Sequence, residues 1–176
     1  MGEGYIIPLN DLKAGVLTRS WSVAKKFFEE FENEEVRSAD LRVEAQARRT
    51  GASVEIDVAI DGTLTVPCDR CLEDVVMPIG TDARLKVRFG EEDADVDEED
   101  GREVVWIPEG ECEFDLSQTI YDYACLDLPI RCVHEEGKCN PEALKHLTDD
   151  PGREDSPESP SQTNPFAALK GMFDEK

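Results

Sequence analysis

Apolar and polar residues alternate along the middle of the chain. One such run extends from residue 41 to residue 48 and a second from residue 54 to residue 60. A period of two is typical of strands that bury one face. The apolar members are Leu41, Val43, Ala45 and Ala47, followed by Val54, Ile56, Val58 and Ile60. The short connection Thr50-Gly51-Ala52 predicts that the two runs form a hairpin.

Further strands are expected around this hairpin. Asp61-Gly62 is a turn signal, and residues 63–66 then form another extended segment. Residues 84–89 alternate again, and short strands are predicted at residues 5–8 and 104–107. An antiparallel meander is the simplest arrangement, so we expect an α+β fold, mainly an antiparallel β-sheet with a few short helices.

Three stretches predict helices. Thr18 or Ser20 can cap a first helix, whose apolar residues are Trp21, Ala24, Phe28 and Phe31. Asp115 is expected to cap a second helix that ends before Pro129. Its apolar residues Leu116, Ile120, Ala124 and Leu128 lie at four-residue steps. A third, short helix is predicted from Asn140 to Leu147.

Composition divides the chain into a domain, residues 1–147, and a tail, residues 148–176. Within the domain, residues 91–103 contain nine acidic residues and one arginine, so they predict a mobile loop. The tail begins with a stretch rich in Asp, Pro, Ser and Gly, which is typical of a disordered linker. Residues 164–173 then predict a short amphipathic helix.

The net charge of −22 favours a basic protein over nucleic acid as the partner. Nucleic acid is bound through lysine and arginine, so we expect a basic protein, ribosomal or acting in assembly, to fit this surface better. An acidic proteome adapted to salt would explain the charge equally well. The start has no signal-peptide pattern and no apolar run could span a bilayer, so we expect a cytoplasmic protein without membrane contact.

Cysteine spacing indicates a metal site. Cys68 and Cys71 form a C-x-x-C motif on an expected turn, and Cys132, His134 and Cys139 follow downstream. Closed structural zinc sites are tetrahedral and have four ligands, which are cysteine thiolates and histidine imidazoles. Cys68, Cys71 and Cys139 are the first three candidates, and His134 and Cys132 compete for the fourth place.

Other interpretations of these thiols stay open. The C-x-x-C could serve a thiol–disulfide oxidoreductase, although such a motif normally opens a helix in a βαβ unit. The thiols could also pack without metal. Cys112 and Cys125 are expected to be small buried hydrophobic residues. No phosphate-binding loop or nucleophile elbow occurs in the sequence, and four protein ligands leave a metal no open position for water, so we expect no enzymatic activity.

Several motifs together give the chain a family resemblance. They include residues 66–73 around the C-x-x-C, residues 84–90, the acidic insert, residues 114–121, residues 126–129, His134 and Cys139. In this order and spacing they resemble the YceD-like family over nearly the full length. The closing residues 164–170 are similar to the family's Asp-Pro-Arg ending, with Asn164 and Phe166 in place of Asp and Arg.

The resemblance implies an accessory role in the accumulation of large-subunit (23S) ribosomal RNA and in ribosome biogenesis. It also favours His134 over Cys132 as the fourth ligand, giving Cys68, Cys71, His134 and Cys139 as the predicted zinc site. A module that sequesters a basic ribosomal protein is an alternative. Arg84, Lys86 and Arg88 share one face of an expected strand, so a solvent-exposed basic stripe predicts weak contact with ribosomal RNA.

Overall fold

The computed structural model describes residues 4–10, 12, 15–91 and 98–148. The chain divides into two units, residues 1–144 and residues 145–176. The predicted linker and terminal helix lie almost entirely outside the described residues. The architecture described below is that of the first unit.

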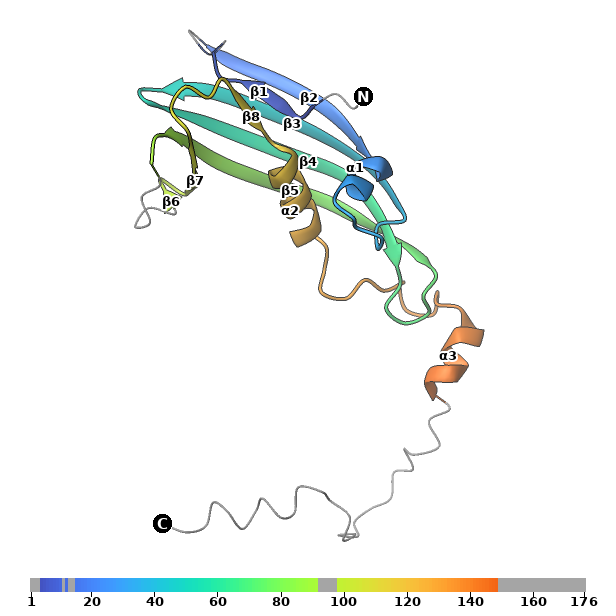
Figure 1. Ribbon diagram of the computed structural model, residues 1–176. Coiled ribbons are helices and arrows are strands. Elements are labelled where there is room, and N and C mark those ends of the chain that lie inside the picture. The colour runs from blue at the N-terminus through green and yellow to red at the C-terminus, as the bar shows by residue number, and fades with distance from the viewer. Residues whose placement is uncertain (1–3, 11, 13–14, 92–97, 149–176) are drawn as a thin grey trace, which may run out of the picture. The chain divides into compact units, whose positions relative to one another are not determined.

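A six-stranded sheet forms the centre of the first unit (Figure 1). Its spatial order is β2-β3-β4-β5-β7-β6. Neighbouring strands from β2 to β5 are antiparallel, which confirms the predicted mainly antiparallel sheet. The bounds are β2 Val16–Ala24, β3 Ser38–Thr50, β4 Ser53–Pro67, β5 Asp74–Phe89, β6 Glu98–Glu99 and β7 Arg102–Ile107.

The predicted hairpin is confirmed as β3 and β4, paired from Ser38–Thr65 to Thr50–Ser53. The turn expected at Asp61-Gly62 is wrong, because β4 continues without interruption to Pro67. Gly62 pairs with Leu41 at a φ of 147°, a conformation that other residues rarely adopt. A Cβ at Gly62 would also lie 2.8 Å from the Cα of Leu41. Glycine therefore allows close approach of two strands here, rather than a turn.

The first predicted helix is largely wrong. Residues 16–24 form β2, paired with β3 over its whole length, and helix α1 covers only Lys25–Glu30. Trp21 lies in the strand opposite Val43, whereas Phe27 and Phe28 are buried on α1. Aromatic residues at helical spacing can also belong to a strand followed by a helix. Here residues 16–24 form a strand because they pair with β3.

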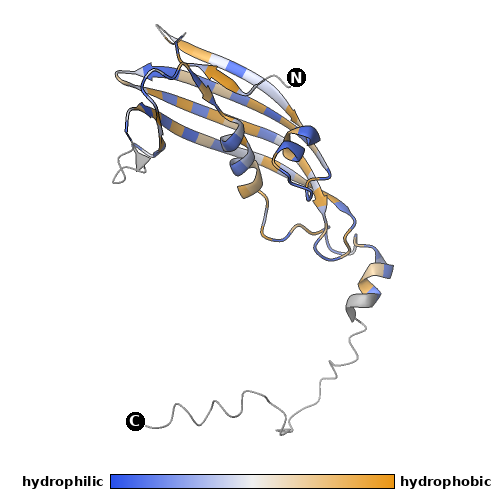
Figure 2. Cartoon of the chain, in the orientation of Figure 1, coloured by the Kyte–Doolittle hydropathy of each residue, from blue (hydrophilic) through white to orange (hydrophobic). Residues whose placement is uncertain are grey.

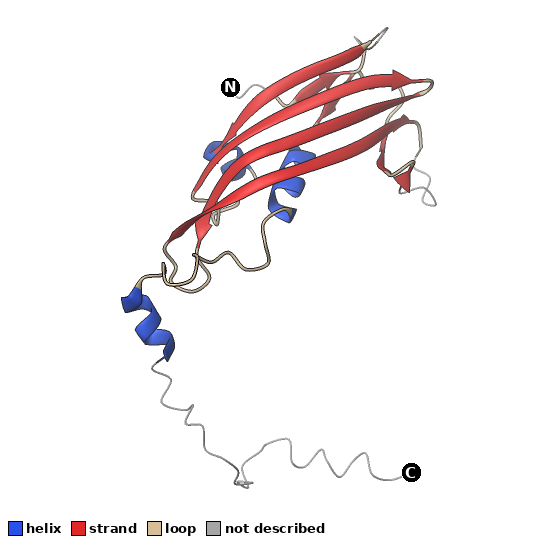
Figure 3. Ribbon diagram, turned by 180° about the vertical axis from the view of Figure 1, so that it is seen from behind, coloured by secondary structure: helices blue, strands red, loops and turns tan. Residues whose placement is uncertain are grey.

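Two helices and a small sheet lie over one face of the main sheet, as Figures 1 and 3 show from opposite sides. The small sheet pairs β1, Ile6–Pro8, with β8, Glu113–Asp115. Helix α2, Ser117–Leu126, follows directly, and the Asp115 carboxylate accepts a hydrogen bond from the Ser117 backbone at 2.8 Å. The strands alternate in hydropathy (Figure 2), and their apolar sides form the core with Ile7, Phe28 and Ile120.

The connection between β5 and β7 departs from the expected meander. These two strands pair in parallel, from Leu85–Glu103 to Phe89–Ile107. The predicted acidic loop is therefore wrong for residues 98–103, where β6 and the start of β7 form a hairpin. Residues 92–97 of that loop lie outside the described residues.

The predicted basic stripe on β5 is only partly exposed. Arg84 is exposed, but Lys86 is 8% exposed and its ammonium lies 3.2 Å from Asp100. The guanidinium of Arg88 lies over the ring of Trp106, with 5.5 Å between its carbon and the ring centre. The expectation that all three side chains are in solvent is wrong, because β7 pairs with β5 and the turn between β6 and β7 places Asp100 against Lys86.

Helix α3 spans Pro141–Thr148, and the side chain of Asn140 accepts a hydrogen bond from the Glu142 backbone at 2.9 Å, as expected of an N-cap. Within the described part of the chain, no helix combines the length and the apolar character needed to cross a membrane.

Candidate metal centre

The C-x-x-C motif forms the turn between β4 and β5. The backbone N–H of Leu72 donates to the carbonyl of Cys68 at 2.9 Å, and the N–H of Cys68 donates to the carbonyl of Glu73 at 2.8 Å. Leu72 has a φ of 62°, which reverses the chain after the second cysteine. The turn therefore holds Cys68 and Cys71 close together at the end of a hairpin.

The second group of ligands lies on the segment that joins α2 to α3. Two hydrogen bonds join Cys132 to Asp69: the Cys132 N–H donates to the Asp69 carboxylate at 2.6 Å, and the Asp69 N–H donates to the Cys132 carbonyl at 2.8 Å. Further along, the Asn140 amide donates to the Glu73 carboxylate at 2.7 Å. These bonds hold His134 and Cys139 against the C-x-x-C turn.

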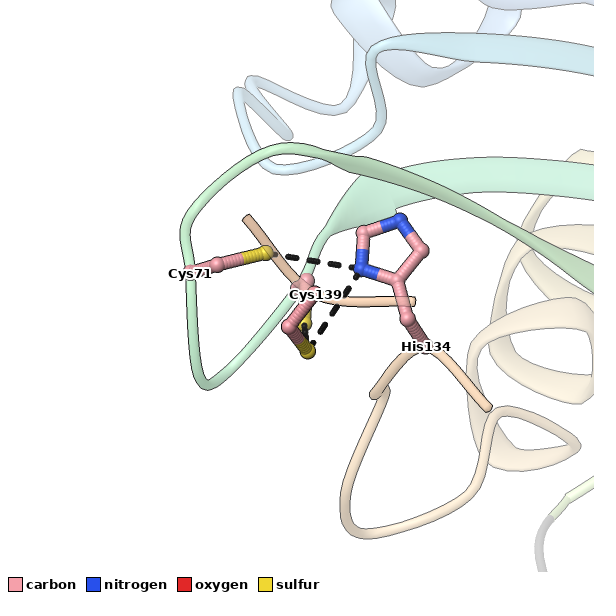
Figure 4. Close-up of side chains that lie close together, drawn as sticks. Cys71, His134 and Cys139 are labelled. Carbon is pink, nitrogen blue, oxygen red and sulfur yellow. Dashed lines mark hydrogen bonds between the residues drawn. The ribbon is translucent and has the colours of Figure 1, made fainter. Parts of the chain in front are cut away.

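Cys68, Cys71, His134 and Cys139 converge so that one potential ligand atom from each lies within 4.8 Å of the others. The Cys71 sulfur is 3.4 Å from His134 Nδ1, and the Cys139 sulfur is 3.9 Å from the same nitrogen (Figure 4). The Cys68 and Cys139 sulfurs are 3.9 Å apart. The three cysteines are almost completely buried.

These separations suit a tetrahedral metal ion. Bonds of about 2.3 Å to sulfur and about 2.0 Å to nitrogen place two sulfurs about 3.8 Å apart and a sulfur about 3.5 Å from a nitrogen. The three separations given above, 3.4–3.9 Å, agree within a few tenths of an ångström, and all pairs lie within 4.8 Å. Three thiols with one imidazole are also a usual ligand set of closed structural zinc sites. The cluster could therefore hold a metal ion.

His134 is oriented for ligation through Nδ1. Its other ring nitrogen, Nε2, lies 3.1 Å from the backbone carbonyl of Asp74. A carbonyl only accepts, so this contact places the proton on Nε2 and leaves Nδ1 as the lone-pair donor. Outer hydrogen bonds of this kind orient the histidine ligands of metal sites.

Protonation in the cluster favours a thiolate at Cys68. Burial raises the pKa of this thiol, but the backbone N–H groups of Cys71, Arg70 and His134 outweigh burial and lower the pKa to about 6. The hydrogen bond to Cys68 raises the pKa of His134 despite the opposing effect of burial. Burial raises the pKa of Cys139, and hydrogen bonds to Cys68 and Cys71 raise it further. The cluster thus stabilises one thiolate even before a cation neutralises it.

The other cysteines take different places. Cys132 is outside the group of four, and its sulfur lies 3.5 Å from the carbonyl of Pro129. Cys125 is half-buried on α2, whereas Cys112 is exposed, so the expectation that Cys112 is a buried hydrophobic residue is wrong. Sequence reasoning missed Asp69, Glu73 and Asn140, because the hydrogen bonds that join the two ligand segments depend on three-dimensional contacts.

One family profile, described as large ribosomal RNA subunit accumulation protein YceD, matches residues 56–173. The match covers about two thirds of the chain and includes all four residues of the cluster. The chain belongs to the YceD family. Comparison with curated proteins and with solved structures found no match. YceD membership ties the chain to large-subunit ribosomal RNA accumulation, and neither this family nor the site geometry indicates an enzymatic activity.

The YceD match begins within β4. Strands β1, β2 and β3 and helix α1 precede it, yet β3 pairs with β4 along thirteen residues. The matched half of the sheet therefore depends on the unmatched half for its core. The cysteine turn and the segment carrying His134 and Cys139 lie in the matched part.

Proposed function

We propose that this YceD-family protein is a non-enzymatic accessory factor in the synthesis and accumulation of large-subunit (23S) ribosomal RNA and in ribosome biogenesis. The family match over residues 56–173, with the four-residue cluster inside it, carries this proposal. The protein would act in the cytoplasm, where it would meet ribosomal RNA and ribosomal proteins.

The cluster would hold one zinc ion through Cys68, Cys71, His134 and Cys139. Zinc is preferred because it binds three thiolates and one imidazole in tetrahedral geometry without redox change. Four protein ligands fill its coordination shell, so the ion would be structural and would supply no activated water. What it would supply is a link between the β4–β5 turn and the α2–α3 segment.

The protein would act by binding a basic ribosomal or assembly protein, with only weak contact to ribosomal RNA. The net charge of −22 supports this order of preference, since it attracts lysine- and arginine-rich surfaces and repels phosphates. Among the residues predicted to touch RNA, Arg84 is the exposed one, whereas Lys86 is buried beside Asp100.

A thiol–disulfide oxidoreductase is the second candidate, and the lowered pKa of Cys68 is the observation in its favour. Against it, Cys68 is 0% exposed and the motif lies in a turn between antiparallel strands rather than at the start of a helix. A buried thiolate without access for a substrate disulfide suits a metal ligand better.

Complementation of a strain that lacks the gene tests the proposed function. The wild-type chain and Cys112→Ser, which changes a cysteine outside the cluster, should restore 23S ribosomal RNA relative to 16S ribosomal RNA. Cys139→Ser should fail to restore it while the protein is still made. Full restoration by a Cys139→Ser protein shown to lack metal would contradict a role for the metal in this function.

A further inference from the structure

A groove lies beside the metal centre, within the first unit of the chain. Its volume is ≈ 380 Å³, and it is bounded by the loop after α1, the end of β4, helix α2 and the segment after α2. Its lining mixes apolar side chains, such as Tyr121 and Leu128, with polar ones, such as Asn33 and Glu35. This volume is near the low end of the range for ligand pockets, about 300–1,000 Å³, so it suits one or two side chains rather than a folded element.

The wall of this groove carries an apolar side chain that the fold does not bury. Ile130 lines the groove and is 104% exposed, the largest value among the large apolar residues that the structure describes. Leu126, at the end of α2, is 79% exposed. The segment that leads from the end of α2 past the groove thus places two large aliphatic side chains in solvent, one of them in the groove wall.

The metal centre holds this wall in place. Ile130 lies two residues before Cys132, whose backbone is hydrogen-bonded to Asp69 at 2.6 and 2.8 Å. His134 and Cys139 then hold the same segment against the cysteine turn. Loss of the ion would remove the hold at His134 and Cys139 and leave the segment that carries Ile130 fixed only by the two hydrogen bonds between Cys132 and Asp69. Binding in the groove would therefore weaken when the ion is lost, although no ligand residue lines the groove.

The acidic charge around the groove favours a basic molecule as its occupant. The charged side chains among the groove's described lining residues are Glu35 and Asp69, both acidic. A second copy of the chain would bring another −22 charges to the same surface, and RNA would bring phosphates, so both are repelled. A basic protein segment with a bulky apolar residue matches both the acidic side chains and the apolar part of the lining.

We propose that this groove, with Ile130 on its wall, is the docking site for a basic protein segment that inserts a bulky apolar anchor residue. The proposal rests on the proposed function, because it names the surface through which the YceD-family protein would hold its basic partner. The zinc ion would then act in partner binding by keeping the Ile130 wall in its place.

The test uses the full-length, zinc-loaded chain and tiled peptides that cover the basic proteins of the large ribosomal subunit. Peptides that bind should contain lysine or arginine together with a bulky apolar residue. Changing that residue to serine, or changing Ile130→Ser in the protein, should each weaken binding about tenfold, because the contact of one aliphatic side chain is lost. Fluorescence anisotropy of labelled peptides measures both effects.

Matched controls separate docking from folding. Val76→Ser changes another exposed apolar residue, on β5 and outside the groove, and should leave peptide affinity unchanged. Both Ile130→Ser and Val76→Ser should keep the melting temperature and the zinc content of the wild type. Peptide affinity of Ile130→Ser equal to the wild type, binding by no peptide, or equal affinity for serine-substituted peptides would overturn the proposal.

Two other outcomes would show that the groove binds a different molecule. A wild-type dimer that Ile130→Ser converts to a monomer would identify a second copy as the occupant. Tight binding to ribosomal RNA that Ile130→Ser abolishes would identify RNA. Complementation separates the docking proposal from the proposed function. If Cys139→Ser impairs ribosomal RNA accumulation and Ile130→Ser does not, the docking proposal is wrong and the proposed function stands. If neither variant has an effect, the metal and the groove both have no part in that function. If the wild-type chain does not restore 23S ribosomal RNA in the strain that lacks the gene, the proposed function itself fails.

Discussion

Asp69 and Cys132 exchange two hydrogen bonds, with the Cys132 N–H on the Asp69 carboxylate at 2.6 Å and the Asp69 N–H on the Cys132 carbonyl at 2.8 Å. Asp69 lies between the cysteines of the turn, and Cys132 lies two residues before His134. The pair thus joins the two ligand-bearing segments without any metal. We expect the centre to be partly assembled before the ion binds.

Asp69→Ala should weaken this link. Removing one acceptor from a partly exposed hydrogen bond should lower the free energy of unfolding by about 1 kcal/mol and speed the loss of zinc to a chelator. Asp69→Asn retains a side-chain oxygen that can accept a hydrogen bond from the Cys132 N–H. Its stability and its rate of zinc loss should therefore be closer to those of the wild type. Chelator competition followed with a colorimetric zinc indicator measures the rate.

Glu136→Ala, an exposed carboxylate between His134 and Cys139, is the control and should release zinc at the wild-type rate. If Asp69→Ala and Glu136→Ala release zinc equally slowly, the Asp69–Cys132 pair has no part in holding the site.

Gly62→Ala should destabilise the fold strongly. A methyl group there meets the backbone of Asp40 and Leu41, and the φ of 147° is unfavourable for alanine. We expect a loss of about 2–4 kcal/mol in the free energy of unfolding, measured by urea denaturation. Gly80→Ala, on the neighbouring strand with only the Asp61 carboxylate at 3.9 Å, is the matched control and should change stability little. Comparable stability of the two variants would argue against the close β3–β4 approach.

The metal-free protein should show a pH-dependent thiolate. The pKa of Cys68 is about 6 in the fold, below the ordinary value near 8.5. A lowered folded-state pKa stabilises the fold above the unfolded-state pKa, and this contribution declines as pH falls from about 8.5 and is lost below about 6. Ultraviolet thiolate absorbance of the metal-stripped protein should therefore titrate with a midpoint near 6. The Cys68→Ser variant should lack that step, and a wild-type midpoint near 8.5 would disagree with the buried hydrogen bonds.

Direct RNA binding should be weak. The isolated protein should bind ribosomal RNA with an affinity that falls steeply with salt, and Arg84→Glu should reduce the salt slope by about one. Arg19→Glu changes an exposed arginine on β2 and serves as the charge-matched control. Lys86→Glu is unsuited to this test because Lys86 is buried beside Asp100, so its replacement would disturb the fold. Nanomolar, salt-resistant RNA binding would contradict a protein partner as the main contact.

Local pattern predicted much of the sheet. The alternation from Leu41 to Ile60 specifies β3 and β4 because each strand buries one face, and pairing along thirteen residues confirms it. The helix expected around Trp21 is wrong because its spacing fits a strand and a helix in succession. Residues 84–89 and 104–107 both have the pattern of strands, but this pattern does not say whether the two strands run parallel or antiparallel. Their parallel pairing could therefore not be predicted from it.

The four residues of the candidate site could be predicted because their chemistry is rare in the chain. Cysteine and histidine in two clusters leave few possible sets of ligands, and the structure brings Cys68, Cys71, His134 and Cys139 together. The choice between Cys132 and His134 came from family resemblance. The bonds from Asp69 and Asn140, and the groove beside Ile130, arise from tertiary contacts between segments about sixty residues or more apart, which local pattern does not contain.

Zinc content of the purified full-length chain, prepared without chelator and measured by elemental analysis, shows whether the four-residue cluster holds a metal ion. The metal centre predicts one zinc per chain in the wild type and in Cys132→Ser, and loss of zinc with a lower melting temperature in His134→Ala and Cys139→Ser. A wild-type protein that holds no metal and instead cycles a Cys68–Cys71 disulfide would contradict a structural metal centre and favour a redox role.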